Sequence, residues 1–455
     1  MKKKIILATL TMVLSIGALA GCGGGSSNSN ASTQTQNNTS ANDTAVTNDT
    51  TTPDTSNANT QTDQVIEVFQ FKVEFAEAFD RMASDYFDET GVRVEVTTVG
   101  GGTDYGPALR TNFSSGEGPA IYNIGGPDDV DTWLGSLADL SDMKSVPIAS
   151  SGSLEPVSRD GNIYGIPFAI EGYGLIYNKE VFEKAGIDPQ SITNFEQLRS
   201  AVVELDSKKD ELGIQAVFAF PAAETWVTGL HTLNPVIAGE FGDIIATFDA
   251  KTLDFTYADQ YKQIIDLQNN YSVQPTVTLD YSQQVERLFS LGEVAMIQQG
   301  NWVYGSIEGI DADFAENKIG MIPLQYEGIN ENTLPVGVPM YWAVNSNLDQ
   351  ATQQAAKDFL DWMYTSETGK NYVLDEFKFI PAYEGYDLDR ISDPLSRDVY
   401  SYASQGNSSN WVFMGFPTDW GMGVVGTDIQ AYVSGVLEWD DLIQNAKDRW
   451  NSSRE

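Results

Sequence analysis

The sequence predicts an α/β protein built from two successive lobes. Strand-like and helical segments alternate from Val65 onward, and the same alternation returns after residue 178. This rhythm is typical of mostly parallel sheets that carry helices on both faces. The alternating part, about 390 of the 455 residues, is long enough for two domains of ordinary size.

The N-terminus has the pattern of an export signal. Lysines at 2–4 precede an apolar run at 5–20 that is short for a membrane span. The motif LAGC at 19–22 resembles a bacterial lipobox, which implies cleavage before Cys22 and a lipid on its thiol. An ordinary secretory signal with an incidental cysteine is the alternative. We predict a signal peptide over 1–21 and lipidation of Cys22, the only cysteine of the chain.

The next segment is polar and of low complexity. Residues 23–63 contain no aromatic side chain and few apolar ones, so they cannot bury enough surface to offset the entropy of ordering. We expect 22–63 to be a lipidated cysteine and a disordered tether, with a reach of roughly 35 Å. This predicts a protein held on the outer side of the cell membrane, facing the exterior or the periplasm.

The charge of the chain limits its partners. The formal net charge is −38, which repels nucleic acid, anionic lipid headgroups and polyanionic ligands. A neutral ligand is unaffected by this balance. After the N-terminal run, no segment offers 18 unbroken apolar residues.

The first predicted lobe is a βαβαβ unit. Its first helix stops at Gly91, and the strand that follows stops at the glycines 100–102. In chain order the expected elements are strand 65–71, helix 74–91, strand 92–100, helix 104–116 and strand 119–126.

The second predicted lobe repeats this alternation. Asn194 stands directly before an amphipathic run and has the chemistry of an N-cap. The expected elements are helices 180–186 and 195–209, strand 213–220, helices 257–271 and 282–292, and strand 294–299. Beyond them we expect a strand at 335–345, a helix at 350–369, a loop-rich stretch at 379–419 and a closing helix within 431–450.

Five blocks of sequence, taken in order, resemble one family. They are YGIPFAIEGYGLIYNKEVFEKAGID (164–188), LFSLGEVAMIQQGNW (288–302), IGMIPL (319–324), YWAVN (341–345) with AAKDFLDWMYTSE (355–367), and FIPAYEG (379–385). They are similar to signature blocks of the bacterial extracellular solute-binding proteins of family 1, the sugar-binding lipoproteins of ABC importers related to maltose-binding protein. The resemblance covers essentially all of 64–455.

The resemblance implies a two-lobe periplasmic-binding-protein fold of type II, with the ligand cleft between the lobes. It implies a first lobe over 64–170 with about 338–378 returning to it, and a second lobe over 171–337 with about 379–455 returning to it. It also implies a monomer that captures a neutral carbohydrate, above all an oligosaccharide, and delivers it to ABC permease subunits. We expect no enzymatic activity, no cofactor and no metal site.

A neutral sugar presents hydroxyl rims and apolar C–H faces, so its site needs hydrogen-bonding groups and flat aromatic surfaces. Glu171 matches the family's acidic position and would accept hydroxyl donors; a structural ion pair with a nearby Lys or Arg is the alternative. Trp302 matches the family's G-x-W block and resembles a stacking platform; an aromatic packed at the hinge is the alternative. Tyr341 and Trp342 lie on the return crossing, where a strand directs one of two neighbours into the core.

The second lobe offers further candidates by position. Trp420 falls where the maltose-binding relatives place a late aromatic, and Trp411 or Phe413 are alternatives to it. Trp226 and Glu224 stand where the family often supplies an aromatic and an acid.

The first lobe offers acidic candidates. Asp104 and Tyr105 follow the glycines at 100–102, in a loop that starts a helix. Asp128 and its neighbour Asp129 are counterparts of charged sugar contacts that relatives carry after GP-x-I-x, although the glycines and proline differ here.

Other functions remain open on the residues alone. The same fold with a polyamine, a metal or another non-sugar solute suits the many acids, and an exported glycosidase would need only two carboxylates. His231 is the single histidine, so histidine-based nucleophile activation would depend on one residue. No GxxxxGK[ST] phosphate loop occurs, and the segment 311–317 lacks the glycine of a calcium loop.

Overall fold

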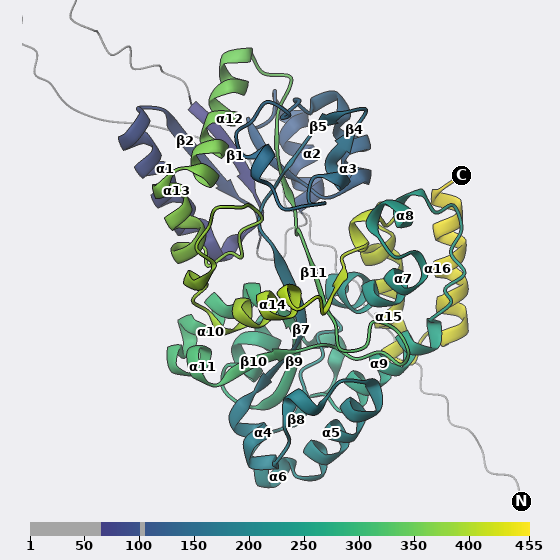
Figure 1. Ribbon diagram of the computed structural model, residues 1–455. Coiled ribbons are helices and arrows are strands. Elements are labelled where there is room, and N and C mark those ends of the chain that lie inside the picture. The colour runs from purple at the N-terminus through teal and green to yellow at the C-terminus, as the bar shows by residue number, and fades with distance from the viewer. Residues whose placement is uncertain (1–64, 101–104) are drawn as a thin grey trace, which may run out of the picture. The chain divides into compact units, whose positions relative to one another are not determined.

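The computed structural model describes residues 65–100 and 105–455 (Figure 1). The predicted signal peptide, Cys22, the tether and Asp104 lie outside these residues. The strands are β1 (Val65–Gln70), β2 (Arg93–Thr98), β3 (Ile121–Ile124), β4 (Ser158–Arg159), β5 (Asn162–Ile163), β6 (Ile166–Pro167), β7 (Glu171–Asn178), β8 (Ala216–Phe218), β9 (Val294–Gly300), β10 (Ile319–Ile322), β11 (Leu334–Gly337), β12 (Tyr341–Val344) and β13 (Ser408–Asn410).

The α-helices cover both lobes. They are α1 (Ala76–Thr90), α2 (Tyr105–Ser115), α3 (Pro127–Trp133), α4 (Lys179–Ala185), α5 (Phe195–Ser207), α6 (Lys209–Leu212), α7 (Asn234–Phe241), α8 (Ile244–Asp249), α9 (Ala258–Asn270), α10 (Tyr304–Ile310), α11 (Ala312–Asn317), α12 (Gln350–Thr365), α13 (Glu367–Asn371), α14 (Pro394–Ser404), α15 (Thr427–Val433) and α16 (Trp439–Ser453). Wider, π-helical turns form Val227–Thr232, Ser282–Phe289, Tyr372–Glu376 and Trp420–Gly426. Among the described residues, no helix is both long enough and apolar enough to cross a bilayer.

The first lobe is built on a five-stranded sheet in the order β2-β1-β3-β12-β6. β1 runs parallel to β2 and β3, whereas β12 runs antiparallel to β3 and β6. Successive residues of β3 point to opposite faces, so Ile121 packs in the core that α1 and α12 cover, and Tyr122 in the core that α2 and α3 cover (Figure 1). The strands and helices expected for this lobe are all present.

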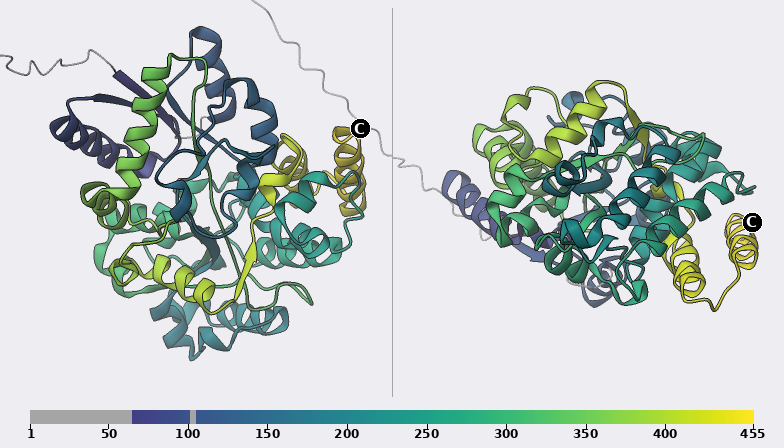
Figure 2. Two further views of the ribbon diagram at one scale, coloured as in Figure 1. Left: turned by 45° about the horizontal axis from the view of Figure 1, so that its top comes forward. Right: turned by 90° about the horizontal axis from the view of Figure 1, so that it is seen from below.

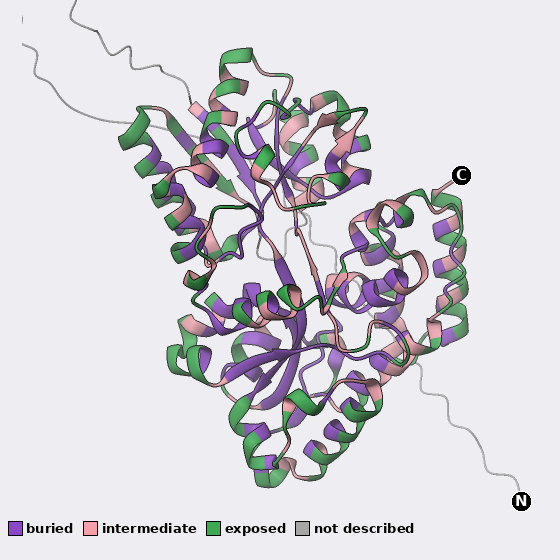
Figure 3. Ribbon diagram, in the orientation of Figure 1, coloured by how far each residue is buried: buried purple, intermediate pink, exposed green. Residues whose placement is uncertain are grey.

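The second lobe is built on a sheet in the order β13-β11-β7-β9-β8, and β10 also pairs with β7. Among the described strands of this sheet, β8–β9 and β11–β13 pair in parallel, and β7 runs antiparallel to β9, β10 and β11. The expectation of a mostly parallel sheet is therefore wrong for this lobe. β7 enters from the first lobe and not from a preceding helix, so the strand–helix rhythm does not fix its direction. β7 and β9 are buried along their whole length (Figure 3).

Local signals explain several helix boundaries. Asn194 caps α5 as expected, because its side chain accepts a hydrogen bond from the backbone N–H of Gln197 at 3.0 Å. The closing helix, expected within 431–450, begins only at Trp439, after a turn in which Gly435 has a φ of 71°. This helix, α16, lies at the margin of the second lobe in the views of Figure 2.

One helix lies in the stretch that was expected to be loop-rich, 379–419. The side chain of Asp393 accepts from the backbone N–H of Ser396 at 2.8 Å, and Pro394 occupies the first helical position of α14. Asp at the N-cap followed by Pro is a start signal, so the sequence did contain the information for this helix.

The chain passes between the two sheets along three segments. The first joins β6 to β7, the second joins β11 to β12, and the third follows α13 (Figure 1). The backbone N–H of Ile170 donates to the carbonyl of Ile380 at 2.8 Å, so the third segment lies against the first. Phe379 and Tyr383 pack in the first-lobe core that α1 and α12 cover, whereas Ile380 packs in the core of the second lobe. The chain segment near residue 379 therefore borders the cores of both lobes.

Candidate functional site

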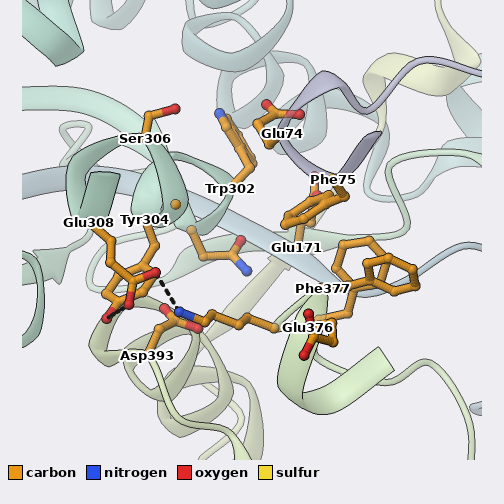
Figure 4. A pocket seen from close by; sticks show the side chains of 14 residues that line it. Glu74, Phe75, Glu171, Trp302, Tyr304, Ser306, Glu308, Glu376, Phe377 and Asp393 are labelled. Carbon is orange, nitrogen blue, oxygen red and sulfur yellow. Dashed lines mark hydrogen bonds and ion pairs between the residues drawn. The ribbon is translucent and has the colours of Figure 1, made fainter. Parts of the chain in front are cut away.

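A cavity of about 320 Å³ lies where the loop after β1 meets the second lobe and the third crossing segment (Figure 4). Glu74 and Phe75 line it from the first lobe, and Tyr304 from the second. Glu171 and Trp302, the two candidates taken from the family motifs, line this same cavity. A larger hollow of about 730 Å³ between α5 and α9 contains none of the candidate residues.

Glu171 begins β7 and is almost completely buried, with 4% of its surface exposed. Its Oε1 lies 2.5 Å from Nζ of Lys72, which is also buried and stands in the loop just after β1. Burial raises the pKa of Glu171, and the Lys72 ammonium opposes this shift. The side chain of Gln70 fixes the turn at Lys72, because its Oε1 accepts from the Lys72 N–H at 2.5 Å. The ion pair that the sequence left as an alternative is present, and it joins the first lobe to the crossing strand.

Asn301 ties the start of β7, which follows the first crossing segment, to α14, which follows the third. Its Oδ1 accepts from the Gly172 N–H at 3.1 Å, and its Nδ2 donates to Oγ of Ser396 at 3.0 Å. Ser396 belongs to the first turn of α14, which Asp393 caps. Burial raises the pKa of Asp393 to about 6. Asn301, which precedes Trp302, is thus hydrogen-bonded to the elements that follow the first and the third crossing segments.

Trp302 has 9% of its surface exposed, and its indole Nε1 donates to Oε1 of Gln299 at 3.0 Å. Its ring folds back over Gly300, where a Cβ atom would lie only 2.1 Å from a ring carbon. Only glycine at 300 leaves room for this conformation. The glycine of the G-x-W block therefore sets the position of the tryptophan.

Trp302 belongs to an aromatic cluster in the second lobe. We use this name for the following side chains: Tyr173, Trp226, His231, Trp302, Trp411 and Phe413. The ring centroids of His231 and Trp302 lie 5.3 Å apart, and those of Trp226 and Trp302 lie 6.3 Å apart. Nζ of Lys72 lies 5.6 Å from the ring centroid of Trp302, so a cation from the first lobe faces this cluster.

Two further candidates, Trp226 and Glu224, are bonded to each other. Nε1 of Trp226 donates to Oε2 of Glu224 at 2.7 Å, and the other carboxylate oxygen accepts from the Tyr281 N–H at 2.8 Å. Trp226 lies in the aromatic cluster, whereas Glu224 holds its indole and the start of the neighbouring helical segment. Trp411 and Phe413, given as alternatives to Trp420, also lie in the cluster, with centroids 5.1 Å apart.

Trp420 lies in the core and not at the cavity. It is 1% exposed, its ring packs edge-on against Trp450 at 4.8 Å, and its Nε1 donates to the carbonyl of Ala446 at 2.8 Å. The placement of Trp420 among the cleft aromatics is corrected here. The partners belong to α16, and nothing in the local sequence around Trp420 shows that this helix covers it.

Tyr341 and Trp342 are both in the core of the first lobe. Trp342 donates from Nε1 to the hydroxyl of Tyr364 at 2.8 Å, and Tyr341 packs in the core on the other face of β12. Helices cover both faces of this sheet, so the expectation that one of the two residues stays free is wrong. Strand alternation separates the two side chains but exposes neither.

The described candidates of the first lobe bond to other groups of the protein. Asp128 accepts a hydrogen bond from the Thr418 hydroxyl, which bridges α3 to the second lobe. Oδ2 of Asp129 accepts from the Gly125 N–H at 2.6 Å, and burial raises its pKa. The hydroxyl of Tyr105 bonds backbone groups of β1 and β3. None of these side chains lines the 320 Å³ cavity.

Most glutamates that line the cavity form ion pairs with cations of the protein. Nζ of Lys378 lies 2.6 Å from Glu308, a contact drawn at Glu308 in Figure 4, and Arg81 lies 2.5 Å from Glu376. Glu171 is paired with Lys72, whereas Glu74 is exposed. In the described part of the chain, no group of three or more His, Cys, Asp or Glu side chains is arranged to hold a metal ion.

Sequence reasoning missed Lys72 and gave His231 no binding role. Lys72 stands at the carboxyl end of β1, and side chains at this edge of an α/β sheet commonly face the ligand crevice, so its position was a usable signal. No pattern in the segment around His231 indicates that four aromatic rings from distant segments, together with Trp226, surround it.

Comparison with known proteins identifies the family. The family model for bacterial extracellular solute-binding proteins matches residues 72–370. The chain belongs to the bacterial extracellular solute-binding proteins. The resemblance drawn from the motifs is thereby confirmed, and proteins of this family bind solutes outside the cytoplasm.

This solute-binding protein is 24% identical to the maltotriose-binding protein of Pyrococcus abyssi over 348 residues, 73% of this chain and 68% of that protein. It is similar in structure to RafE in complex with raffinose, with a TM-score of 0.70 and 19% identity over 86% of this chain and 100% of that chain. A chitin oligosaccharide binding protein gives a TM-score of 0.71 and 20% identity over 86% and 99% of the two chains. These structures share the predicted two-lobe fold. The chain matches about a third of the length of the first curated relatives, 29% to 34%.

Proposed function

We propose that this protein binds a neutral carbohydrate, above all an oligosaccharide, between its lobes and passes it to the permease subunits of an ABC importer. The observation that carries the proposal is the aromatic cluster next to the cavity that Glu171 and Trp302 line. Aromatic rings suit the C–H faces of a sugar, and the printed names of relatives include maltotriose, raffinose and chitin oligosaccharide.

In this proposal Trp302 stacks on a sugar ring and Glu171 accepts sugar hydroxyls. An ionised carboxylate has about four lone-pair sites, and Lys72 uses part of one oxygen only. The Lys72 ammonium favours the ionised form of the buried carboxylate. In this proposal its other N–H groups donate to oxygens of the ligand. Because the hydrogen bonds involve charged groups, they are of the stronger kind.

The charge pattern favours a neutral ligand over a polyamine. Glu171, Glu308 and Glu376 each face a cation of the protein itself. A polyamine would have to displace these partners, whereas a sugar hydroxyl can add to a paired carboxylate. Spermidine binding would favour the alternative.

A thermal-shift series tests the ligand class. Raffinose, maltotriose, a chitin oligosaccharide and spermidine are added separately at rising concentration to the purified protein from residue 64 onward. A sugar at a hundredfold excess over its Kd should add about 2.7 kcal/mol to the free energy of unfolding. Stabilisation by spermidine alone would overturn the proposal. Sugar products that accumulate with time would show an enzyme instead of a binding protein.

We further propose that the protein works as a monomer at the outer face of the cell membrane, held by a lipid on Cys22. The support is the lipobox-like motif and the polar segment 23–63. Cys22→Ala should release the protein or leave its precursor unprocessed, as fractionation and mass spectrometry of cells would show. Membrane retention of a processed, signal-free Cys22→Ala protein would contradict the lipid anchor.

A further inference from the structure

His231, the only histidine of the chain, belongs to the aromatic cluster, but the proposed function gives its ring nitrogens no role. It lies in the π-helical turn Val227–Thr232 of the second lobe. Turns of this kind widen a helix locally and occur often at functional sites, because they re-aim one side chain.

The imidazole of His231 is held in one orientation. It stacks on Tyr173 with centroids 4.3 Å apart and planes inclined by 11°, and the Tyr173 hydroxyl donates to the His231 carbonyl at 3.0 Å. The edge of Trp226 meets the imidazole at 5.2 Å and 84°, and Phe413 lies 5.4 Å away. Rings therefore fix this side chain without any polar contact to its nitrogens.

The ring nitrogens of His231 have no partner in residues 65–100 and 105–455. The side chain is 8% exposed, and none of the hydrogen bonds or ion pairs of these residues involves Nδ1 or Nε2. Burial, with the Lys72 charge, lowers the pKa of His231 to about 3, so at neutral pH the ring carries one N–H donor and one acceptor nitrogen. Neither nitrogen is among the side-chain atoms of these residues that are fully buried without a partner, so both stay within reach of water or of a ligand group.

A second polar group in the same cluster is also unused. Nε1 of Trp411 is buried and has no hydrogen-bond partner in the described residues, although its ring lies 5.9 Å from His231 and 5.6 Å from Tyr173. A phenylalanine at either place would pack without leaving a nitrogen unpaired. His231 and Trp411 do not themselves line the cavity, but Trp302 does, and its ring centroid lies 5.3 Å from that of His231. The unpartnered nitrogens of His231 and Trp411 therefore lie one ring behind the cavity wall.

We propose that His231 is a specificity-determining contact of the carbohydrate site: its imidazole exchanges hydrogen bonds with a sugar hydroxyl, and Nε1 of Trp411 donates to a neighbouring oxygen of the same sugar. A hydroxyl is both donor and acceptor, so it matches an imidazole that offers both. The inference rests on the proposed function, because it assigns to His231 the hydrogen bonds to the hydroxyls of a sugar whose faces stack on the aromatic rings.

The first experiment uses the single histidine as a probe. Protein labelled with ¹⁵N-histidine shows one imidazole, and raffinose and maltotriose are titrated in turn while its two nitrogen resonances are followed. A sugar that binds should shift at least one nitrogen in the direction of a new hydrogen bond. Binding of a sugar that leaves both resonances unchanged would overturn the inference.

Variants separate a polar role from packing. His231→Phe keeps a ring and should weaken binding by about tenfold, whereas His231→Gln restores an amide donor and acceptor and should recover part of the loss. Trp411→Phe should weaken binding less, because it removes one donor. Trp420→Phe is the matched control, since it removes an indole N–H that is bonded in the core. Wild-type affinity of His231→Phe would contradict the contact.

Chemical modification of the imidazole keeps this inference distinct from the proposed function. Diethyl pyrocarbonate should modify His231 in the native protein at neutral pH, and a bound sugar should protect it. Resistance in the native state with reaction in urea would show a sealed imidazole and overturn the inference even if sugars bind. If the imidazole reacts but no sugar stabilises the protein, the ligand is not a sugar. That result would overturn the proposed function, and with it the sugar contact of His231.

Discussion

The two lobes bring unlike chemistry to the site. The first lobe offers the loop after β1, with the buried cation Lys72 and the cavity residues Glu74 and Phe75. The second lobe offers the aromatic cluster, in which rings from separate segments surround His231. In the proposed site, the second lobe supplies the aromatic platform, whereas the first lobe supplies the cation that pairs with Glu171 at the crossing.

The largest expected effect comes from removing the first lobe's charge. Lys72→Met leaves Glu171 buried without a cation and should lower the free energy of unfolding by about 3–5 kcal/mol at pH 7. Adding Glu171→Gln to Lys72→Met should recover most of this loss, because no buried charge then remains. Urea unfolding of both variants measures the difference.

The exposed pair Arg199–Glu196 is the matched control for that experiment. Its two side chains are more than half exposed, so removing either should change the urea midpoint little. A similarly small effect of Lys72→Met would show that water reaches Glu171. The claim that the first lobe supplies a necessary cation would then be wrong.

Removing the platform should act on binding instead of folding. Trp302→Ala should weaken sugar binding by about 1–3 kcal/mol or more, in the range of a buried aromatic anchor. Glu171→Gln should weaken it less than Glu171→Ala, since the amide keeps a carbonyl acceptor. Calorimetric titration with a sugar selected in the thermal-shift series gives these values.

Trp362 provides the control for this comparison. It is a partly buried tryptophan on α12, bonded to Glu89 and remote from the cavity lining, so Trp362→Ala should change stability and leave affinity intact. If Trp302→Ala is folded and binds normally, the platform lies elsewhere.

The buried histidine should give the second lobe a pH response of its own. The folded-state pKa of His231, about 3, lies below the ordinary value of 6.5, so the unfolded chain takes up the proton first. This contribution to stability is present above pH 6.5 and is lost as pH falls toward 3. Between pH 7.5 and 5.5 it should amount to about 1.4 kcal/mol.

His231→Phe isolates that contribution from the carboxylates. Urea unfolding at both pH values should show a fall in wild-type stability that exceeds the fall in the variant by about 1.4 kcal/mol. Equal falls in the two proteins would mean that His231 is protonated as easily when folded as when unfolded, which contradicts its desolvated position.

The sequence predicted what is local or carried by a motif. The cap at Asn194 was predictable because the signal and its target are three residues apart. Glu171 and Trp302, which line one cavity, were predictable as candidates because both belong to family blocks. The Lys72–Glu171 pair joins residues 99 positions apart, and no spacing rule reaches that far. Trp420 was misplaced for the same reason, since α16 docks on it from a later part of the chain.

The smallest expected effect concerns salt, and it decides between the two chemistries. Glu171, Glu308 and Glu376 are already paired with cations of the protein, and a neutral sugar brings no charge to screen. Raising the ionic strength from about 0.05 to 0.5 M should therefore change the binding free energy by less than about 0.5 kcal/mol. Calorimetric titration at both salt concentrations measures this, with spermidine as the charged comparison. A steep loss of affinity with salt would show that the ligand binds through charge, and the first lobe and its acids, instead of the aromatic cluster, would then dominate recognition.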